Sequence, residues 1–392
     1  MDLKNSALEE WMRKYYHSAQ FDIGSSGVQD LSLGQLFKLL EIQLYELSNI
    51  IFNDNDTFGS AEIKLAIAER WGDGNSDTVM VGNGSNEVIF QILTSLIKSN
   101  DEIIILHPIY HTLGQLAQTI TKNYKFWSLK PEMDWQPDLE ELKKIISSNT
   151  KFLIVNFPHN PTGISLTNKQ LKQLIEICTH FDVTLIWDAA FEDVTFIQQP
   201  LTNPYLQYHK TIYIGTLSKS YGLPGLRVGW SIASPEIIQK CKDIKDYTSL
   251  YVSPLNDWIA TKTIQDIDKV INYLRPKLDK NYVIFAEWLS KHQQYLHGIM
   301  PQGGTIAFLR FIDNRDTLPF CNYLARTKHT LVVPGECFGY PQYFRVGFGQ
   351  QTEILKRGLE HLSDALTNCI VNYYNTGDVL KKKKIALCKS SI

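Results

Sequence analysis

The stretch Thr216-Leu-Ser-Lys219-Ser-Tyr-Gly-Leu-Pro-Gly-Leu-Arg227-Val-Gly-Trp230 places a lysine among small and apolar residues, directly after the apolar run Thr211–Gly215. A lysine in such surroundings lacks the usual reason for solvent exposure. A partly desolvated amine can be neutral, as Schiff-base chemistry requires. Arg227 lies eight positions after Lys219, beyond a Pro-Gly turn, and can return to the same place to hold an anion. We therefore predict a reactive lysine at the end of a strand.

On both sides of this lysine, from about residue 75 to 235, apolar runs alternate with amphipathic stretches. The runs are Thr78–Val81, Glu102–Leu106, Phe152–Asn156, Thr184–Trp187, Thr211–Gly215 and Val228–Ser231, and the helical patterns include Glu87–Ile97, Leu139–Ile146 and Asn168–His180. Strands separated by helices of 10–15 residues predict an α/β fold with a mainly parallel sheet covered on both faces. Ligands of such sheets lie beyond the carboxyl ends of the strands.

The rest of the chain predicts a second, smaller α/β unit. A long helical pattern, Asn256–Leu289, has few breakers before Pro276. It is followed by strand patterns at Gly303–Phe311, Leu331–Val333 and Tyr343–Phe348 and by helical patterns at Thr317–Thr327 and Glu353–Asn368. We expect a large domain over residues 45–275, a small domain over 276–372 and a disordered tail over 373–392, where Lys381–Lys384 is solvated. Residues 1–44, with a helix at Leu8–Ala19 and a turn at Gly24–Gly27, should pack with the small domain and the active site.

Composition excludes several classes of protein. The 392 residues contain 39 Lys and Arg against 41 Asp and Glu, a net charge of −2 that argues against a nucleic-acid binder. No run of 18 apolar residues predicts a membrane span, and the first residues lack an apolar signal-peptide core. The six cysteines are scattered without CxxC spacing, so neither a metal site nor a disulfide framework is expected. We predict a cytoplasmic protein.

The segment Val81-Gly-Asn-Gly84-Ser85-Asn86-Glu87 runs from a strand into a helix. It is either a simple turn or a site where backbone N–H groups at a helix start hold a phosphate. A dinucleotide fingerprint would have a third glycine at position 87, where this chain has Glu87. A nicotinamide cofactor is therefore not expected.

Two further motifs end apolar strands: Asn156-Phe-Pro-His159-Asn160-Pro-Thr-Gly163 and Trp187-Asp188-Ala-Ala-Phe191. By themselves they could be a proline turn and a helix cap. Beside Lys219 they acquire another meaning, because a buried carboxylate that pairs with a protonated pyridine nitrogen is what pyridoxal 5'-phosphate requires. Tyr110 also follows a strand and could stack on a ring. For His159, a neutral packed histidine is favoured over a group that helps a hydroxyl to depart.

Taken together, these residues resemble the fold-type-I pyridoxal-phosphate enzymes of the aminotransferase class I/II family, over roughly residues 20 to 370. The resemblance implies a homodimer, with the loop Tyr247–Pro254 reaching the neighbouring site, and an amino-acid substrate. It implies that Lys219 is the Schiff-base lysine and general acid/base, that Asp188 pairs with the ring nitrogen, and that Asn160 and Tyr110 contact the ring. The implied phosphate ligands are Gly84, Ser85, Asn86, Thr216, Ser218 and Arg227. Arg345 is implied to bind the substrate carboxylate; a surface salt bridge is the alternative.

A narrower resemblance rests on five stretches together: Leu8-Glu9-Glu10-Trp11, Asp22–Val28, Asn156–Asn160, Gly215–Trp230 and Val332–Gly335. These stretches are similar to those of capreomycidine synthase and the enduracididine-forming cyclase of the guanitoxin pathway. The implied activity removes water from a hydroxy-L-arginine and closes a guanidine ring, with 4-hydroxyarginine to L-enduracididine ahead of 3-hydroxyarginine to capreomycidine. The alternatives are an aminotransferase of a basic or aromatic amino acid and a non-catalytic regulator. The latter would need a DNA-binding domain for which 44 residues leave little room.

The sequence departs from the family pattern in two places. Phe191 stands where the family has a tyrosine that donates to the ring's phenolic oxygen. The tyrosine that reaches the neighbouring subunit's phosphate is absent from Phe52–Gly59. For the guanidinium we expect contacts from Glu9, Ser25 and Ser26, although Glu9 could instead lie on a solvated helix face. Gly27 and Asn160 are also expected to bind the substrate. Phe21, Trp187 and Trp230 are expected in the core.

Overall fold

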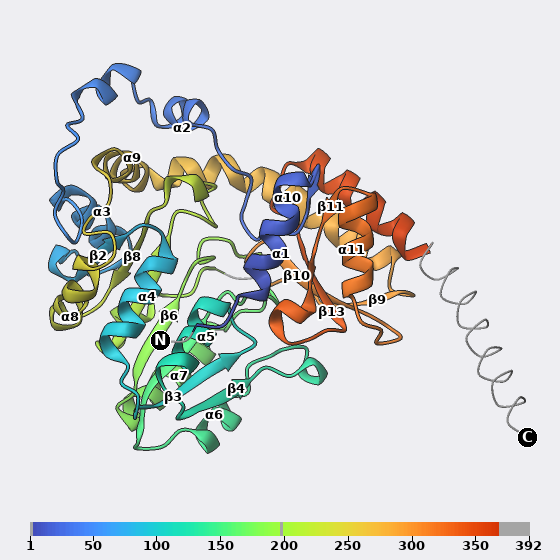
Figure 1. Cartoon of the computed structure of the whole chain (residues 1–392), viewed down its shortest axis with the longest axis horizontal. Helices are drawn as coiled ribbons and strands as arrows, with labels where there is room; N and C mark the ends of the chain where they lie inside the picture. Colours follow the sequence, from blue (N-terminus) through green and yellow to red (C-terminus); the bar gives the residue numbers. More distant parts are fainter. Residues whose placement is uncertain (1–2, 197–198, 368–392) are drawn as a thin grey trace, which may run out of the picture.

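The computed structural model describes residues 3–196 and 199–367, and its centre is a seven-stranded sheet (Figure 1). The order is β2 (Val79–Gly82), β8 (Gly229–Ile232), β7 (Thr211–Thr216), β6 (Thr184–Asp188), β5 (Thr150–Asn156), β3 (Glu102–His107) and β4 (Tyr124–Ser128). Strands β7, β6, β5, β3 and β4 are parallel, while β8 runs antiparallel to both of its neighbours. The predicted α/β fold with a mainly parallel sheet is confirmed.

Successive side chains of a strand point to opposite faces of the large sheet, and each face has its own buried core. On β6, Leu185 and Trp187 belong to one buried cluster and Ile186 to the other. The first cluster is covered by α6 (Leu139–Ile145) and α7 (Asn168–Phe181), and the second by α4 (Ser85–Leu96), α5 (His111–Ile120) and α8 (Pro235–Asp246). The edge strand β4, whose side chains are mostly half-buried, was not predicted because it lacks a continuous apolar run.

A second, antiparallel sheet has the order β12 (Val333–Pro334), β13 (Tyr343–Gly347), β10 (Ile306–Phe311) and β9 (Leu296–His297). The helical pattern expected over 256–289 divides at Asp266 into α9 (Pro254–Gln265) and α10 (Ile267–Lys291). Pro276 lies inside α10, where buried Leu274 and Leu278 hold the helix in place. The domain boundary predicted at residue 275 thus falls within a continuous helix, and the division into domains stays a prediction.

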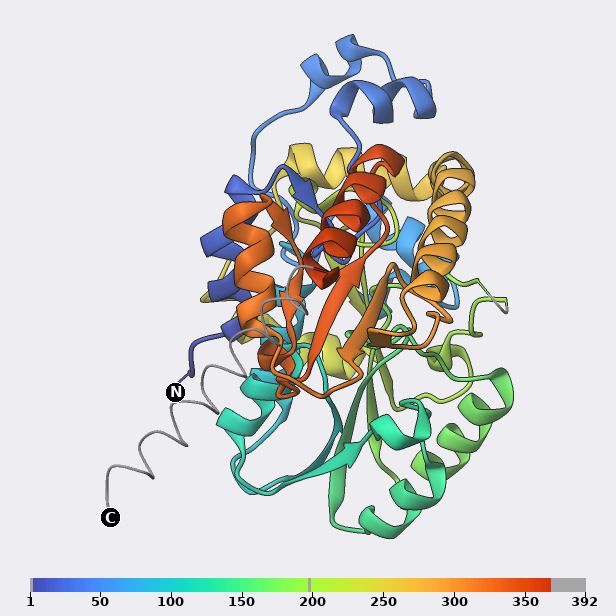
Figure 2. The ribbon, with the colours of Figure 1, turned by 90° about the vertical axis from the view of Figure 1, so that its right-hand side faces the viewer.

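The N-terminal segment packs against residues 318–332, which precede β12 of the second sheet. Helix α1 (Ala7–Tyr15) lies beside α11 (Leu318–Thr327), where the Tyr15 hydroxyl donates to Asn322 at 2.6 Å (Figure 2). The Trp11 indole donates to the carbonyl of Val332 at 2.8 Å. After α1, strand β1 (Phe21–Asp22) pairs in parallel with β11 (Thr330–Leu331). Residues 23–28, which follow β1, make backbone hydrogen bonds to Gly347 of β13 and to Lys219 after β7.

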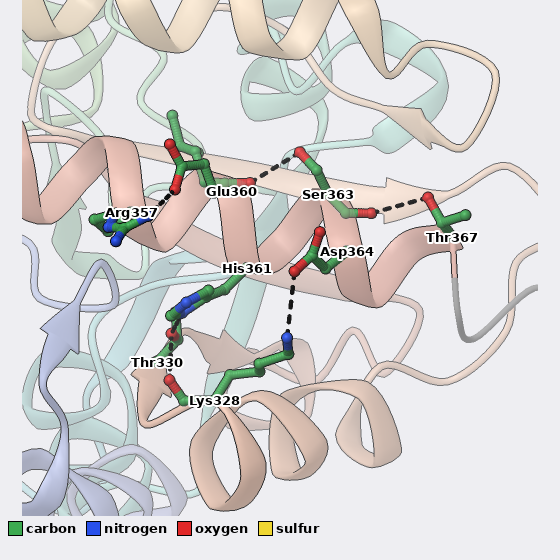
Figure 3. A network of polar contacts seen from close by, with 9 residues as sticks. Lys328, Thr330, Arg357, Glu360, His361, Ser363, Asp364 and Thr367 are labelled. Atoms are coloured by element: carbon green, nitrogen blue, oxygen red, sulfur yellow. Dashed lines mark hydrogen bonds and ion pairs between the residues drawn. The ribbon is translucent and has the colours of Figure 1, made fainter.

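A helix over residues 352–367 supports β11 through polar contacts (Figure 3). His361 Nδ1 lies 2.7 Å from the Thr330 hydroxyl, and Lys328 pairs with Asp364 at 3.3 Å. The ring of Phe21 meets His361 edge-on at 4.9 Å and is only half-buried. The expectation that Phe21 belongs to the core is therefore wrong, because β1 lies at the margin of the molecule, whereas Trp187 and Trp230 are buried as expected.

Within residues 3–196 and 199–367, none of the helices combines the length and apolar character that crossing a bilayer requires. The same residues contain no group of three or more His, Cys, Asp or Glu side chains that could hold a metal ion. The four cysteines in the described part, Cys178, Cys241, Cys321 and Cys337, are unpaired. Lys381–Lys384 and the predicted tail lie outside the described residues.

Candidate active site

A cavity of about 360 Å³ lies at the carboxyl ends of β5, β6 and β7, between the large sheet, α1 and β13. Most of the predicted site residues line it: Glu9, Ser25, Ser26, Ser85, Asn86, Tyr110, Asn160, Asp188, Ser218, Lys219, Arg227 and Arg345. Gly27, Gly84 and Thr216 do not line it but are in contact with lining residues: Gly27 and Thr216 with Ser218, and Gly84 with Arg227. Residues from the first helix to the last strand of the second sheet therefore meet at the place that parallel-sheet geometry favours for a ligand.

Lys219 and Asp188 give the cavity its chemistry. Burial lowers the pKa of the Lys219 ammonium to about 8, and the charge of Arg345 acts in the same direction. Burial raises the pKa of the Asp188 carboxyl to about 7, although its Oδ1 accepts a hydrogen bond from the Ala190 N–H at 3.1 Å. A lysine poised to be neutral is a nucleophile. A buried carboxyl short of a cationic partner fits the protonated ring nitrogen of pyridoxal phosphate.

Asn156 also lines the cavity and contacts the backbone of Asp188. It was not assigned to the site from the sequence. It lies opposite Asp188 in the β5–β6 register, and its Nδ2 donates to the Asp188 carbonyl at 3.0 Å. Its Oδ1 accepts from the N–H of Asn160 at 2.9 Å. A polar residue that closes an apolar strand beside the strand of Asp188 was the available signal.

The turn before α4 forms a cradle for a phosphate. Gly84 has φ +88°, and a Cβ at this position would lie 2.3 Å from Nη2 of Arg227. Arg227 is held in turn by a hydrogen bond from Nη1 to the Pro224 carbonyl at 2.8 Å. The Thr216 hydroxyl donates to Ser218 Oγ at 3.0 Å and keeps it at the cavity wall. A helix start, a guanidinium and hydroxyl groups together suit a phosphate dianion.

Arg345, on β13 of the second sheet, lines the cavity and is buried. Its Nη2 donates to the carbonyl of Gly24 at 2.8 Å, its Nη1 donates to Asn160 Oδ1 at 3.0 Å, and Nε is buried without a partner. Burial lowers the pKa of this guanidinium to about 10. The surface salt bridge is ruled out, because the side chain is only 3% exposed. A buried cation with an unused donor fits a carboxylate.

Residues 23–28 thread between Arg345 and Lys219. The Gly347 N–H donates to the Ile23 carbonyl at 2.8 Å, and the Val28 N–H donates to the Lys219 carbonyl at 3.0 Å. A Cβ on Gly27 would lie 3.3 Å from the Ser218 carbonyl oxygen, closer than most Cβ contacts, so any side chain here would require the Ser218 backbone to shift slightly. Ser25 and Ser26 are thereby placed against the cavity, whereas Gly27 does not line it.

One face of α1 forms the remaining wall. Trp11 and Tyr15 are buried and hydrogen-bond to Val332 and to Asn322 of α11, while Glu9 faces the cavity and accepts a hydrogen bond from the Tyr110 hydroxyl at 3.5 Å. Further lining residues that the sequence analysis did not assign are Leu8, Met12, Arg13, Tyr16, His17, Ala190 and Pro224. The helical period indicates that such residues share a face, but only the docking of Trp11 decides which face meets the cavity. Phe191, a noted departure from the family pattern, also lines it.

Comparison with known proteins agrees with this geometry. Residues 46–362 match the family model of aminotransferase class I and II. The chain belongs to this family. Capreomycidine synthase from Streptomyces vinaceus is 33% identical over 366 residues, which cover 93% of this chain and 94% of that protein. Aspartate aminotransferase from Thermotoga maritima is 26% identical over 323 residues, covering 80% and 83%.

Two solved structures in the comparison superpose on nearly the whole chain. The PLP-dependent cyclase OrfR has a TM-score of 0.90 at 30% identity, with 94% of this chain and 98% of OrfR covered. A PLP-dependent aminotransferase from Streptococcus suis has a TM-score of 0.89 at 27% identity, with coverage of 94% and 99%. The family member described here is thus a pyridoxal-phosphate-dependent enzyme related to capreomycidine synthase and OrfR. The predicted fold type and cofactor are confirmed.

Proposed function

We propose that this enzyme removes water from a hydroxy-L-arginine and closes a ring through its guanidine group. We favour 4-hydroxyarginine and L-enduracididine, with 3-hydroxyarginine and capreomycidine next. The observation that carries the proposal is the position of Glu9. Asp188 is suited to the cofactor ring, which leaves Glu9, at the cavity face of α1 beside Tyr110, as the carboxylate for a guanidinium. The 33% identity to capreomycidine synthase supports the same reaction class.

Each step assigns a task to a residue of this chain. Arg345 binds the α-carboxylate and Glu9 holds the guanidinium, so the flexible substrate is folded between them. Bound pyridoxal phosphate supplies the electron sink. Lys219 takes the Cα proton and, for a hydroxyl on Cγ, also a proton from Cβ. The hydroxyl leaves with one proton as water, and a guanidine nitrogen bonds to the electrophilic side-chain carbon and gives up its own proton. Lys219 then returns a proton to each carbon from which one was taken, so that the net change is the loss of one water. Holding both ends of one molecule together can supply several of the roughly 7–11 kcal/mol that intramolecular reactions gain.

The alternative is an aminotransferase acting on a basic or aromatic amino acid. The apolar and aromatic side chains of Leu8, Met12 and Tyr16 in the cavity wall favour it, because they suit an aromatic substrate. The 27% identical aminotransferase structure from Streptococcus suis favours it also. An aminotransferase needs a keto-acid acceptor, whereas the cyclase does not.

The discriminating experiment incubates the holoenzyme with 3-hydroxy- and 4-hydroxy-L-arginine side by side, each with and without 2-oxoglutarate. We expect a cyclic product that has lost one water without an acceptor, faster from the 4-hydroxy substrate. Mass spectrometry and NMR identify the ring. A keto-acid product that appears only with the acceptor would establish the transferase and contradict the cyclase.

We also propose that the enzyme is a cytoplasmic homodimer. Large apolar side chains protrude from the segment after α2 (Leu33–Leu40): Leu44, Tyr45, Ile51 and Phe52 are each at least 70% exposed. Tyr247, in the loop predicted to reach the neighbouring site, is 91% exposed. Such surface favours burial against a second copy.

Light scattering should give twice the chain mass, and Phe52→Glu should weaken the dimer. A wild-type monomer at micromolar concentration would contradict the proposal. The four cysteines in the described part of the chain are unpaired, which supports the cytoplasmic part of the proposal because the cytoplasm is a reducing compartment.

A further inference from the structure

We propose that His159 is a positioning residue that holds the Tyr110 side of the cofactor pocket at a fixed distance from the Asn160 side. His159 lies in the loop between β5 and α7 and is 1% exposed. It does not line the cavity, so it is no candidate for an acid that helps the substrate hydroxyl to leave. Its role has to be found in its contacts.

Both ring nitrogens of His159 are engaged by short hydrogen bonds. Nε2 lies 2.7 Å from the carbonyl oxygen of Pro108, and Nδ1 lies 2.7 Å from the hydroxyl of Thr162. A carbonyl can only accept, so Nε2 carries the proton and Nδ1 accepts from the threonine. Burial lowers the pKa of the imidazole to about 4, and neighbouring His107 acts in the same direction, in agreement with a neutral ring. The ring orientation is thereby fixed from both sides.

These two contacts join segments that face the cofactor pocket from different strands. Pro108 precedes Tyr110 by two residues in the loop after β3, and Tyr110 lines the cavity. Asn160 directly follows His159 in the loop after β5, lines the same cavity and receives the hydrogen bond from Arg345. The imidazole of His159 therefore links the Pro108 carbonyl to the loop that carries Asn160. A ring that enters between Tyr110 and Asn160 therefore meets two walls whose spacing His159 sets.

The variants separate the two contacts. In His159→Gln, the side-chain amide can reach the Pro108 carbonyl as Nε2 does. In His159→Asn, the shorter side chain can accept from Thr162 but does not reach Pro108. His159→Leu removes both hydrogen bonds at similar volume. As a matched control, His292→Leu removes a histidine hydrogen bond of 2.7 Å to the Trp288 carbonyl at the end of α10, away from the cavity.

The primary readout is the affinity of the apoprotein for pyridoxal phosphate, from absorbance titration, which does not depend on turnover. We expect Leu and Asn at position 159 to weaken binding about tenfold, the equivalent of one buried hydrogen bond. Gln should stay within about threefold of wild type, and the His292 variant within about twofold. The proposal would be overturned if His159→Leu left the affinity for pyridoxal phosphate unchanged. It would also be overturned if His159→Asn bound the cofactor like wild type while His159→Gln bound it more weakly.

A double-mutant cycle distinguishes positioning from a general loss of stability. If His159 acts through the Tyr110 wall, His159→Leu should have little further effect on cofactor affinity in a Tyr110→Ala background. If the two losses in affinity are additive, His159 does not act through Tyr110 and the proposal fails. Thermal unfolding of each apoprotein accompanies the titrations, and if His159→Leu does not fold, the comparison of Gln with Asn decides.

Discussion

Arg345 on β13 donates a hydrogen bond to Oδ1 of Asn160 in the loop after β5, at 3.0 Å and across 185 residues of sequence. The contact joins the second sheet to the large sheet inside the cavity. The same guanidinium donates to the carbonyl of Gly24, so three separate parts of the chain meet on one side chain. Two of its donor groups are committed to the protein, and the unpartnered Nε leaves a donor for an anion.

We predict that Arg345→Lys raises KM for an amino-acid substrate by about 10- to 100-fold, because an ammonium cannot hold Gly24, Asn160 and a carboxylate in one plane. The affinity for pyridoxal phosphate should change much less. Steady-state kinetics and a cofactor titration on the same preparation measure the two effects. Equal losses in both would show that the arginine serves the fold and not the substrate.

Gly84→Ala should weaken pyridoxal-phosphate binding by tenfold or more. The added Cβ would lie 2.3 Å from Nη2 of Arg227, and φ +88° disfavours any side chain. The control is Gly34→Ala in α2, where an added Cβ meets nothing within 4 Å. Equilibrium titration should separate the two variants. A Gly84 variant that binds like the Gly34 variant would contradict the phosphate cradle.

Lys219→Met should stabilise the apoprotein at pH 7 by roughly 1–3 kcal/mol, because burial lowers the pKa of Lys219 to about 8 and the folded state bears the cost of a buried charge below that pH. The gain should shrink as pH rises from 8 towards 10.5, where the unfolded lysine also loses its proton. Denaturant unfolding at several pH values, with exposed Lys242→Met as control, tests this. A pH-independent gain would assign the effect to packing.

With cofactor added, the Lys219 variant should lack the visible absorption of an imine.

Glu9→Gln should raise KM for a hydroxyarginine about tenfold or more, since a charge-assisted hydrogen bond to the guanidinium is lost. Glu10 neighbours Glu9 on α1 but is exposed, so Glu10→Gln is the matched control. Cofactor binding should be unaffected in both. Should the two variants have the same KM, Glu9 would lie on a solvated face, as the other interpretation of the sequence holds.

Phe191→Tyr should lower the pH at which the bound cofactor changes its visible spectrum. The new hydroxyl would extend from a side chain that already lines the cavity and donate to the ring's phenolic oxygen, which favours the deprotonated chromophore. A spectrophotometric pH titration of the holoenzyme gives the midpoint. An unchanged midpoint would mean that residue 191 does not reach the phenolic oxygen.

Much of the large sheet could be predicted because its strands carry their own signal. The parallel strands β5, β6 and β7 are nearly continuous apolar runs, and each is followed by polar residues at the same edge. Asp188 and Lys219 could therefore be placed together without knowing a single long-range contact. The edge strand β4 could not, because only one of its five residues is buried.

The sequence by itself determined which residues are candidates for the chemistry, since motifs at strand ends are local and the edge of a parallel sheet brings them together. Only the tertiary structure decided which face of α1 closes the cavity, that Asn156 braces Asp188, and that His159 joins the loops of Tyr110 and Asn160. Those relationships depend on contacts such as that of Trp11 with Val332, across 321 residues. Distances between segments so far apart are set by how the elements pack, and no local pattern encodes them.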